Sequence, residues 1–380
     1  MAGDAQRRAD AREIASTAPV AEAEAGRAAD GHDDEEEMPR VAMTRRRVIA
    51  SVVFVLAVVA FLYFALPKIG GVQDTWERVS NGDHAWLAAA LVFEILSMAS
   101  YVALFHGVHV PKGSRITLHD SYLMTMAGLA ATRLFAAGGA GGVAVTAWAL
   151  RRSGMERRDV AERMIAFMLL LYGVYVLAMI VCGIGLRTGV FPGPAPFGIT
   201  VIPAVIGLIA FALVLPLALV PEDFPARVEA MAPRRPRTAK WLRRLALGPA
   251  SMRGGIRFAI HKAAHPDRAM FGVATWWIFN VAVLWACFHA FGDAPPMAVI
   301  VQAYFVGMLG NLLPLPGGIG GVDGGMIGAF VAFGVGSSLA IVAVLAYRVF
   351  AFWLPTIPGV IAYIGLRRRV AGWRREPAAA

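Results

Sequence analysis

Six long apolar runs constrain the fold of this chain more than any other feature of its sequence. An α-helix rises about 1.5 Å per residue, so about 20 apolar residues cross the roughly 30 Å hydrocarbon core of a membrane. A soluble core does not need apolar blocks of that length, and we therefore expect an all-α polytopic membrane protein with about six transmembrane helices. The runs lie near residues 48–66, 85–107, 160–185, 198–220, 269–291 and 338–364.

The composition argues against several classes of protein. The chain is 58% hydrophobic and 16% charged, and its formal net charge is +10. The Lys and Arg residues flank the apolar runs, as they do in cytoplasmic loops, so we expect no nucleic-acid partner. The two cysteines, Cys182 and Cys287, both lie within apolar runs and predict neither a disulfide framework nor a zinc site. We expect no metal and no cofactor, and a transporter rather than an enzyme, since no catalytic motif is present in a convincing context.

Two shorter apolar runs each lead into a cluster of glycines. Residues 122–137 precede the cluster at 138–142, and residues 297–313 precede the cluster at 314–321. A short apolar segment follows each cluster. An apolar arm, a glycine turn and a short second arm are typical of a re-entrant hairpin, which enters a membrane and returns to the same side.

The basic residues predict the orientation of the chain. Arginines at 45–47 precede the first apolar run, which places the N-terminus inside. If the first hairpin enters from the cytoplasm and the second from outside, the outer loops hold only Lys68, Arg78 and Arg187. Making either hairpin a full span destroys this asymmetry. We therefore expect a multi-pass protein of the bacterial inner membrane with cytoplasmic N- and C-termini.

The two hairpins match each other at a shift of 179 residues. Three predicted spans separate them, an odd number, so the two halves have opposite orientations. Such inverted repeats with broken helices are a transporter architecture, whereas isolated small residues only ease helix packing. The matched pairs are Gly128 and Gly307, Leu134 and Leu313, Gly138 and Gly317, Gly139 and Gly318, Gly141 and Gly320, Gly142 and Gly321, and Val143 and Val322.

The remaining segments divide the chain into regions. Residues 1–44 are rich in Ala, Asp, Glu and Arg and lack aromatic residues, which predicts a disordered cytoplasmic tail. Residues 45–370 form the expected transmembrane domain, and residues 371–380 a short cytoplasmic tail. The basic loop at 222–268 contains either an interfacial helix on anionic lipid or a solvated segment that only sets topology.

Ionisable side chains at membrane depth are costly, by about 2.5 to 3.5 kcal/mol on insertion scales, and usually serve function. Arg348 and Glu94 lie near the centres of apolar runs, whereas Glu162 and Arg163 begin a span and can reach headgroups. A structural ion pair between helices is the alternative. The candidate headgroup contacts are Arg133, Gly138, Gly139, Gly141, Gly142, Arg163, Asn311, Gly317, Gly318, Gly320, Gly321 and Arg348, with Glu94, Glu162 and Asp323 as charge partners.

The physical reason for these candidates is phosphate chemistry. Unwound glycine backbone and the helix that follows it present N–H groups that attract anions. An arginine donates two parallel hydrogen bonds to phosphate oxygens. We expect Glu94, Glu162 and Asp323 to pair with the arginines when no lipid is bound.

Two motifs of this chain resemble a known family. The stretch from Asn311 to Asp323, followed by Tyr347-Arg348 and the segment 352–355, is similar to the signature of the lysylphosphatidylglycerol synthase transmembrane region, the flippase-like family. The cluster at 138–142, with Arg151-Arg152 and Glu162-Arg163, resembles its first-half motif. The resemblance covers residues 45–370 and implies movement of aminoacylated phosphatidylglycerol between leaflets, with a separate soluble domain as the synthase. The chain departs from the pattern at Val143 and Ala144, where an acidic residue is expected.

These features predict a function. The first hypothesis is translocation of an anionic or phosphate-bearing lipid between leaflets, with the headgroup held near the midplane. The alternatives are a membrane enzyme and an accessory subunit of lipid-linked glycan or aminoacyl-lipid metabolism. We expect no synthase domain after Arg375, so a separate synthase or glycosyltransferase is the expected protein partner.

Overall fold

The computed structural model describes residues 81–111, 113–134, 140–219, 249–265, 268–313 and 315–373. Several predictions fall outside these ranges. They are the span at 48–66, the acidic tail at 1–44, Gly138 and Gly139, the part of the basic loop before residue 249, and the last residues of the C-terminal tail.

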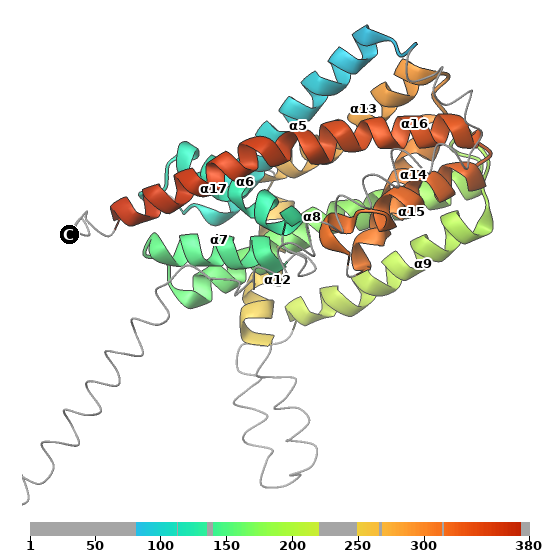
Figure 1. Cartoon of the computed structure of the whole chain (residues 1–380). Helices are drawn as coiled ribbons and strands as arrows, with labels where there is room; N and C mark the ends of the chain where they lie inside the picture. Colours follow the sequence, from blue (N-terminus) through green and yellow to red (C-terminus); the bar gives the residue numbers. More distant parts are fainter. Residues whose placement is uncertain are drawn as a thin grey trace, which may run out of the picture. The chain divides into compact units, whose positions relative to one another are not determined.

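Every regular element in the described ranges is a helix, and five helices are long and apolar enough to cross a membrane (Figure 1). This confirms the all-α fold and five of the predicted spans. The five are α5 (His84–His109), α8 (Arg157–Arg187), α9 (Phe197–Val214) with its continuation η3 (Leu215–Leu219), α13 (Arg268–Phe291), and a continuous helix made of α16 (Ser337–Arg348), η6 (Val349–Trp353) and α17 (Leu354–Trp373).

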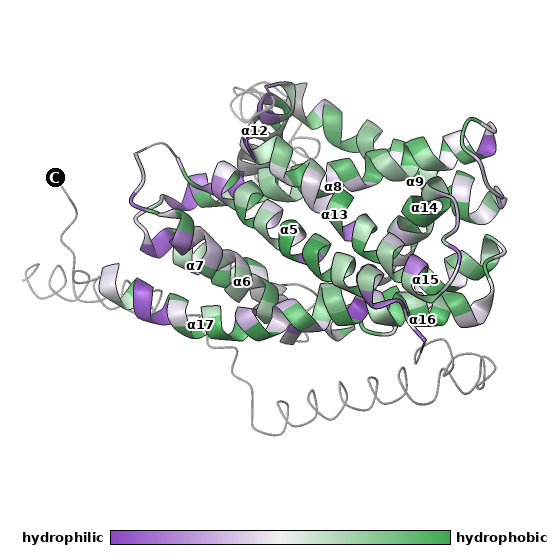
Figure 2. Cartoon of the chain, turned by 90° about the horizontal axis from the view of Figure 1, so that it is seen from above, coloured by the Kyte–Doolittle hydropathy of each residue, from purple (hydrophilic) through white to green (hydrophobic). Residues whose placement is uncertain are grey.

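The last of these helices is longer than its apolar run. It extends over Ser337–Trp373, 37 residues, because the π-helical turn η6 joins α16 to α17 without a break. Its final turns carry Arg367, Arg368 and Arg369, which the hydropathy pattern excludes from the hydrocarbon. Figure 2 shows hydrophilic residues at this end of α17 and on nearby α7.

The helices pair in an order that the chain connectivity does not dictate. α13 packs along α5, α17 along α6 (Leu118–Leu134), and α8 lies between α9 and α12 (Pro249–Ala264). Buried aromatic side chains such as Phe288, Phe305 and Phe330 fill the interior. One face of α9 exposes Ile202, Ile206 and Ile209, which is the surface expected of a helix that borders lipid.

The glycine-tipped segments form two helical hairpins. In the first, α6 packs antiparallel against α7 (Ala140–Arg152). A Cβ on Gly142 would lie 2.6 Å from the Gly128 carbonyl oxygen and would also collide with the Thr132 hydroxyl, so only glycine fits. Gly128 in turn faces Thr146, since a Cβ there would lie 3.2 Å from its hydroxyl.

The second hairpin repeats this arrangement. It consists of α14 (Met297–Met308), η4 (Leu309–Leu312), η5 (Pro316–Gly318) and α15 (Gly321–Ala332). A Cβ on Gly321 would lie 2.8 Å from the Gly310 carbonyl oxygen, and one on Gly325 3.1 Å from that of Gly307. Gly307 and Gly321 are the counterparts of Gly128 and Gly142 at the 179-residue shift. Both hairpins are thus closed by glycines packed on glycine carbonyls, but Gly307 and Gly321 pack on Gly325 and Gly310, respectively, and not on each other.

The last part of the basic loop at 222–268 is helical. Residues Pro249–Ala264 form α12, which packs on the start of α8 through its glycines. A Cβ on Gly255 would lie 2.8 Å from the Glu162 carbonyl oxygen. This part of the loop is thus packed against protein.

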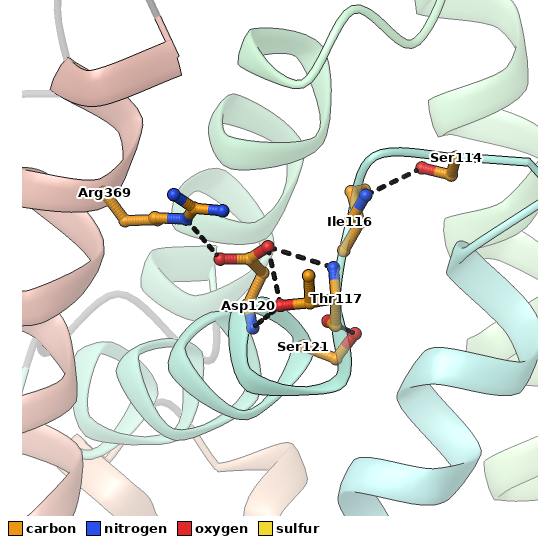
Figure 3. A network of polar contacts seen from close by, with 6 residues as sticks. All are labelled: Ser114, Ile116, Thr117, Asp120, Ser121 and Arg369. Atoms are coloured by element: carbon orange, nitrogen blue, oxygen red, sulfur yellow. Dashed lines mark hydrogen bonds and ion pairs between the residues drawn. The ribbon is translucent and has the colours of Figure 1, made fainter.

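A polar network ties the start of α6 to the end of α17 (Figure 3). Asp120 is fully buried, and its Oδ1 accepts a hydrogen bond of 2.8 Å from Nε of Arg369. Its Oδ2 accepts hydrogen bonds of 2.9 Å from both the backbone N–H and the hydroxyl of Thr117. The Thr117 hydroxyl accepts from the Asp120 N–H at 3.1 Å, which completes a reciprocal capping box. Burial acts to raise the pKa of Asp120, but the bonds from Arg369 and Thr117 outweigh it and lower that pKa below its ordinary value.

We expect Gly142→Ala to destabilise the first hairpin, because the added methyl group meets a backbone carbonyl that cannot move away alone. Overpacking of this kind costs about 1 to 3 kcal/mol. Thermal unfolding of the purified protein in detergent measures the effect. Gly173→Ala on α8 is the matched control, since nothing lies within 4 Å of its added Cβ and helix propensity favours alanine. Equal melting temperatures for the two variants would contradict this packing.

Asp120→Asn is expected to lower the melting temperature at neutral pH, and the difference should vanish in acid. The carboxylate has a depressed pKa in the folded state, so its stabilisation is complete above the ordinary Asp pKa of about 3.9 and disappears as the pH falls through the folded value. Melting curves at stepped pH values test this, with Asp293→Asn in an exposed loop as the control. A gap that does not change with pH would show that the network acts through shape alone.

Candidate functional site

The turn of the second hairpin requires its glycines. Gly317, Gly318 and Gly320 have φ values of 59°, 66° and 85°, a region that side chains other than glycine rarely adopt. The Asn311 side chain also packs against the Cα of Gly318 and leaves no space for a Cβ. The chain thus unwinds between η4 and α15, as the glycine cluster predicts.

Asp323 links this turn to the long C-terminal helix. Its Oδ2 accepts a hydrogen bond of 2.8 Å from the Gly320 N–H and so caps α15. Its Oδ1 forms an ion pair of 2.5 Å with Nε of Arg348, the last residue of α16. The carboxylate is 1% exposed and the arginine side chain 11%. The structure therefore pairs two of the predicted site residues inside the protein.

Arg348 and Arg133 share one aromatic ring. The Arg348 guanidinium carbon lies 4.4 Å from the centroid of Phe352, and that of Arg133 lies 4.9 Å from the same centroid. Cations favour the face of an aromatic ring, and the attraction grows when water is excluded. Arg348 comes from the helix after the second hairpin and Arg133 from the end of α6, in the first. The ring thus joins the two halves of the repeat.

Arg133 completes the backbone hydrogen bonding of the π-helical turn η6. Its Nη2 donates to the Ala351 carbonyl at 3.0 Å, and its Nη1 donates to the Phe352 carbonyl at 2.6 Å and to the Thr356 hydroxyl at 3.1 Å. Pro355 has no N–H, so the Ala351 carbonyl lacks the donor that an α-helix would supply four residues later. Arg133 supplies that donor.

The end of α6 therefore meets the turn of the second hairpin. A Cβ on Gly317 would lie 3.4 Å from the carbonyl oxygen of Arg133, and the Arg348 Nη2 donates to the Gly317 carbonyl at 3.4 Å. The first cluster contributes Gly141 and Gly142 at the start of α7. Two guanidinium groups converge at this junction with one ion-paired carboxylate. Among the described residues Arg133 forms no ion pair, although the Glu94 carboxylate on α5 lies close enough to act on it electrostatically.

Glu94 is buried nearby without a hydrogen-bond partner among the described residues. It lies in the middle of α5 and is 1% exposed, and neither carboxylate oxygen has a hydrogen-bond partner among the described residues. The side chain lines a groove of about 660 Å³ between α5, α6 and α17. The other lining residues are mostly apolar and include Ile95, Met126 and Leu354. The groove is an apolar channel with a carboxyl group at its wall.

Arg163 and Glu162 lie in a different place. Nη1 of Arg163 donates to the Val108 carbonyl at 2.8 Å, and its guanidinium stacks on Phe258 of α12 at 5.2 Å. Glu162 pairs with Arg158 one turn earlier at 2.8 Å. The structure does not bring these two residues together with Arg133 and Arg348.

Several residues of the junction were not singled out as functional from the sequence. The ring of Phe352 contacts the guanidinium groups of both arginines. The buried hydroxyls of Tyr347 and Tyr304 lie 3.2 Å apart near these groups. One signal was available. Pro355 inside an apolar helix predicts an unsatisfied carbonyl at Ala351, and a buried carbonyl of this kind needs a donor from elsewhere in the chain.

The chemistry of this junction suits an oxyanion. The guanidinium donors of Arg133 and Arg348 and the cation-stabilising ring of Phe352 favour a phosphate or carboxylate group. Within the described ranges, no three His, Cys, Asp or Glu side chains lie close enough together to hold a metal ion.

Comparison with known proteins gives the chain its family. Residues 48–359 match the family described as the lysylphosphatidylglycerol synthase TM region. A UPF0104 membrane protein of Methanothermobacter thermautotrophicus is 33% identical over 132 residues, which cover 29% of this chain and 38% of that protein. A UPF0104 membrane protein of Methanocaldococcus jannaschii is 30% identical over 95 residues, 25% of this chain and 28% of that protein.

The aligned part is thus less than half the length of these relatives. The family match, in contrast, extends over most of the chain and includes both hairpins and the arginine junction. With its apolar spanning helices, this chain is a multi-pass membrane protein that belongs to the lysylphosphatidylglycerol synthase transmembrane region family.

Proposed function

We propose that this protein moves a lipid with an anionic or phosphate-bearing headgroup between the leaflets of a membrane. The observation that carries the proposal is the junction between the end of α6 and the turn of the second hairpin. There Arg133 and Arg348 share the ring of Phe352, and among the described residues one carboxylate, Asp323, forms an ion pair. A phosphate diester carries one negative charge and would give Arg133 an ion-pair partner.

The hairpins supply the path. We propose that both are re-entrant, the first from the cytoplasm and the second from the opposite side, in the inner membrane of a bacterium with both termini cytoplasmic. This places the junction near the midplane, where an unpaired charge is most costly. Opposed hairpins with broken helices allow alternating exposure of a central site by rocking of the two halves.

The groove beside Glu94 supports lateral entry of the lipid. Its apolar walls face the side on which Ile95 and Leu354 are exposed, so acyl chains can stay in hydrocarbon while the headgroup reaches the arginines. Glu94 lies along that route, and its carboxylate has no hydrogen-bond partner among the described residues. We propose that Glu94 replaces the phosphate beside Arg133 when the lipid leaves, which keeps the buried cation neutralised.

No contact in the described residues favours the alternative of a membrane enzyme. Asp120, Asp323 and Glu94 lie in separate networks, so no pair of them is placed for acid–base chemistry. An accessory role with a separate synthase or glycosyltransferase is compatible with lipid movement, because that enzyme would supply the lipid that this chain carries.

Arg348→Ala is expected to slow the flipping of fluorescent phosphatidylglycerol in proteoliposomes by about 10- to 100-fold, the effect of losing one charged hydrogen-bonding group worth about 1.5 to 3 kcal/mol. Chemical quenching of the outer-leaflet probe measures the rate. Because the variant leaves Asp323 buried without its cation, the double variant Arg348→Ala with Asp323→Asn is measured beside it to separate function from folding.

Arg187→Ala, an exposed arginine at the end of α8, is the control and should flip lipid at the wild-type rate. Glu94→Gln should retain lipid binding and slow turnover, because release then leaves Arg133 without a counter-charge. If the double variant is folded and flips lipid as fast as the wild type, the arginine junction is not the headgroup site.

A further inference from the structure

A second cavity lies beside the arginine junction, under the first hairpin. It has a volume of about 460 Å³ and is enclosed by α5, α6, α7 and α8. Thr132, which precedes Arg133, lines one part of it, and His109 at the end of α5 lines another. The cavity therefore extends along the first hairpin from Thr132. It is lined by Gly142, one of the candidate headgroup contacts, but by neither Arg133 nor Arg348.

The polar atoms of this cavity are mainly hydrogen-bond acceptors. His109 is 1% exposed, and its Nδ1 lies 3.2 Å from the Phe105 carbonyl oxygen. A carbonyl only accepts, so Nδ1 carries the proton and Nε2, on the far side of the ring, is an acceptor. Nε2 has no hydrogen-bond partner among the described residues.

Threonine and tyrosine hydroxyls complete this set. Thr125 donates to the Ser121 carbonyl at 2.7 Å and Thr132 to that of Gly128 at 2.9 Å, so both hydroxyl oxygens keep lone pairs for a ligand. Thr146 and Tyr101 line the same cavity, and their hydroxyls have no hydrogen-bond partner within the described ranges. These two can donate as well as accept.

The walls define the chemical class of the ligand further. Aromatic rings of Tyr101, Phe105 and Phe167 border the cavity. Phe167 packs tilted against Tyr101, with centroids 5.7 Å apart, and edge-to-face against Phe105 at 6.2 Å. None of the described lining residues is an Asp, Glu, Lys or Arg. An ammonium group would enter without a counter-charge, whereas a neutral polyol donates to the acceptors and lays its C–H groups on the rings.

We propose that this cavity binds the uncharged, hydroxyl-bearing part of a lipid headgroup, such as the glycerol of phosphatidylglycerol. The inference rests on the proposed function for the position of the phosphate, which the arginines would hold while the polyol extends past Thr132 toward His109. The junction then selects charge, and the cavity selects hydroxyl groups.

The test compares two lipids that differ only in hydroxyls. Dioctanoyl phosphatidylglycerol and dioctanoyl phosphatidylpropanol carry the same phosphate diester and a three-carbon headgroup, with and without hydroxyl groups. Binding to the purified full chain is measured by competition in native mass spectrometry. The wild type should prefer phosphatidylglycerol by about 3- to 10-fold, the effect of one or two net neutral hydrogen bonds.

His109→Phe and Thr146→Val should each lower the binding ratio of phosphatidylglycerol to phosphatidylpropanol toward one. Binding of phosphatidylpropanol itself should stay unchanged. Thr200→Val, a buried threonine on α9, is the matched control and should keep the preference. A wild-type ratio near one, or a ratio that both folded variants retain, would overturn the proposal, since it would show that the cavity holds only acyl chain. Tighter binding of dioctanoyl phosphatidylethanolamine than of phosphatidylglycerol would also overturn it in favour of an ammonium site.

Arg348→Ala separates this inference from the proposed function. If it leaves the binding of both phosphate lipids unchanged while His109→Phe and Thr146→Val still abolish the preference, the phosphate assignment fails and the polyol cavity stands. If it weakens both lipids while the two cavity variants change nothing, the polyol cavity fails and the phosphate site stands.

Discussion

The ion pair between Arg348 and Asp323 is the interaction on which the arrangement of the two hairpins depends. Hydrocarbon cannot solvate a guanidinium, so each arginine needs acceptors and a counter-charge from the protein itself. Asp323 meets this need for Arg348 and caps α15 with its other oxygen. One carboxylate thus joins the turn of the second hairpin to the long C-terminal helix, and Phe352 on that helix brings in the first hairpin through Arg133.

The C-terminal helix has the geometry that this junction needs. Pro355 removes one backbone donor, and the π-helical turn Val349–Trp353 shifts the register of the backbone hydrogen bonds. The Ala351 and Phe352 carbonyls become acceptors for Arg133 as a result. A local irregularity thus serves as half of a long-range contact. Pro355 lines the groove beside Glu94, and Thr132, next to Arg133, lines the cavity beside His109.

Local properties of the sequence were enough to predict five spanning helices and the glycine turn of the second hairpin, because hydropathy, length and backbone freedom act within one segment. Predicting which side chains contact each other also requires the packing of the helices. Asp323 and Arg348 lie close enough in the chain for the hairpin to bring them together, and both were candidates. The contact of Arg133 with residues more than 200 positions later depends on the packing of α6 against α17. Arg163 was a candidate headgroup contact like Arg133 and Arg348, but it lies away from them, bound to the end of α5 and to α12.

The central claim is that the hairpins enter from opposite faces of the membrane and meet at the arginines. Single cysteines at Ser114, before the first hairpin, and at Asp293, before the second, test it most directly in a chain whose Cys182 and Cys287 are replaced by alanine. A membrane-impermeant maleimide should label one position only in right-side-out vesicles and the other only in inverted vesicles. Labelling of both positions from the same side would contradict the account.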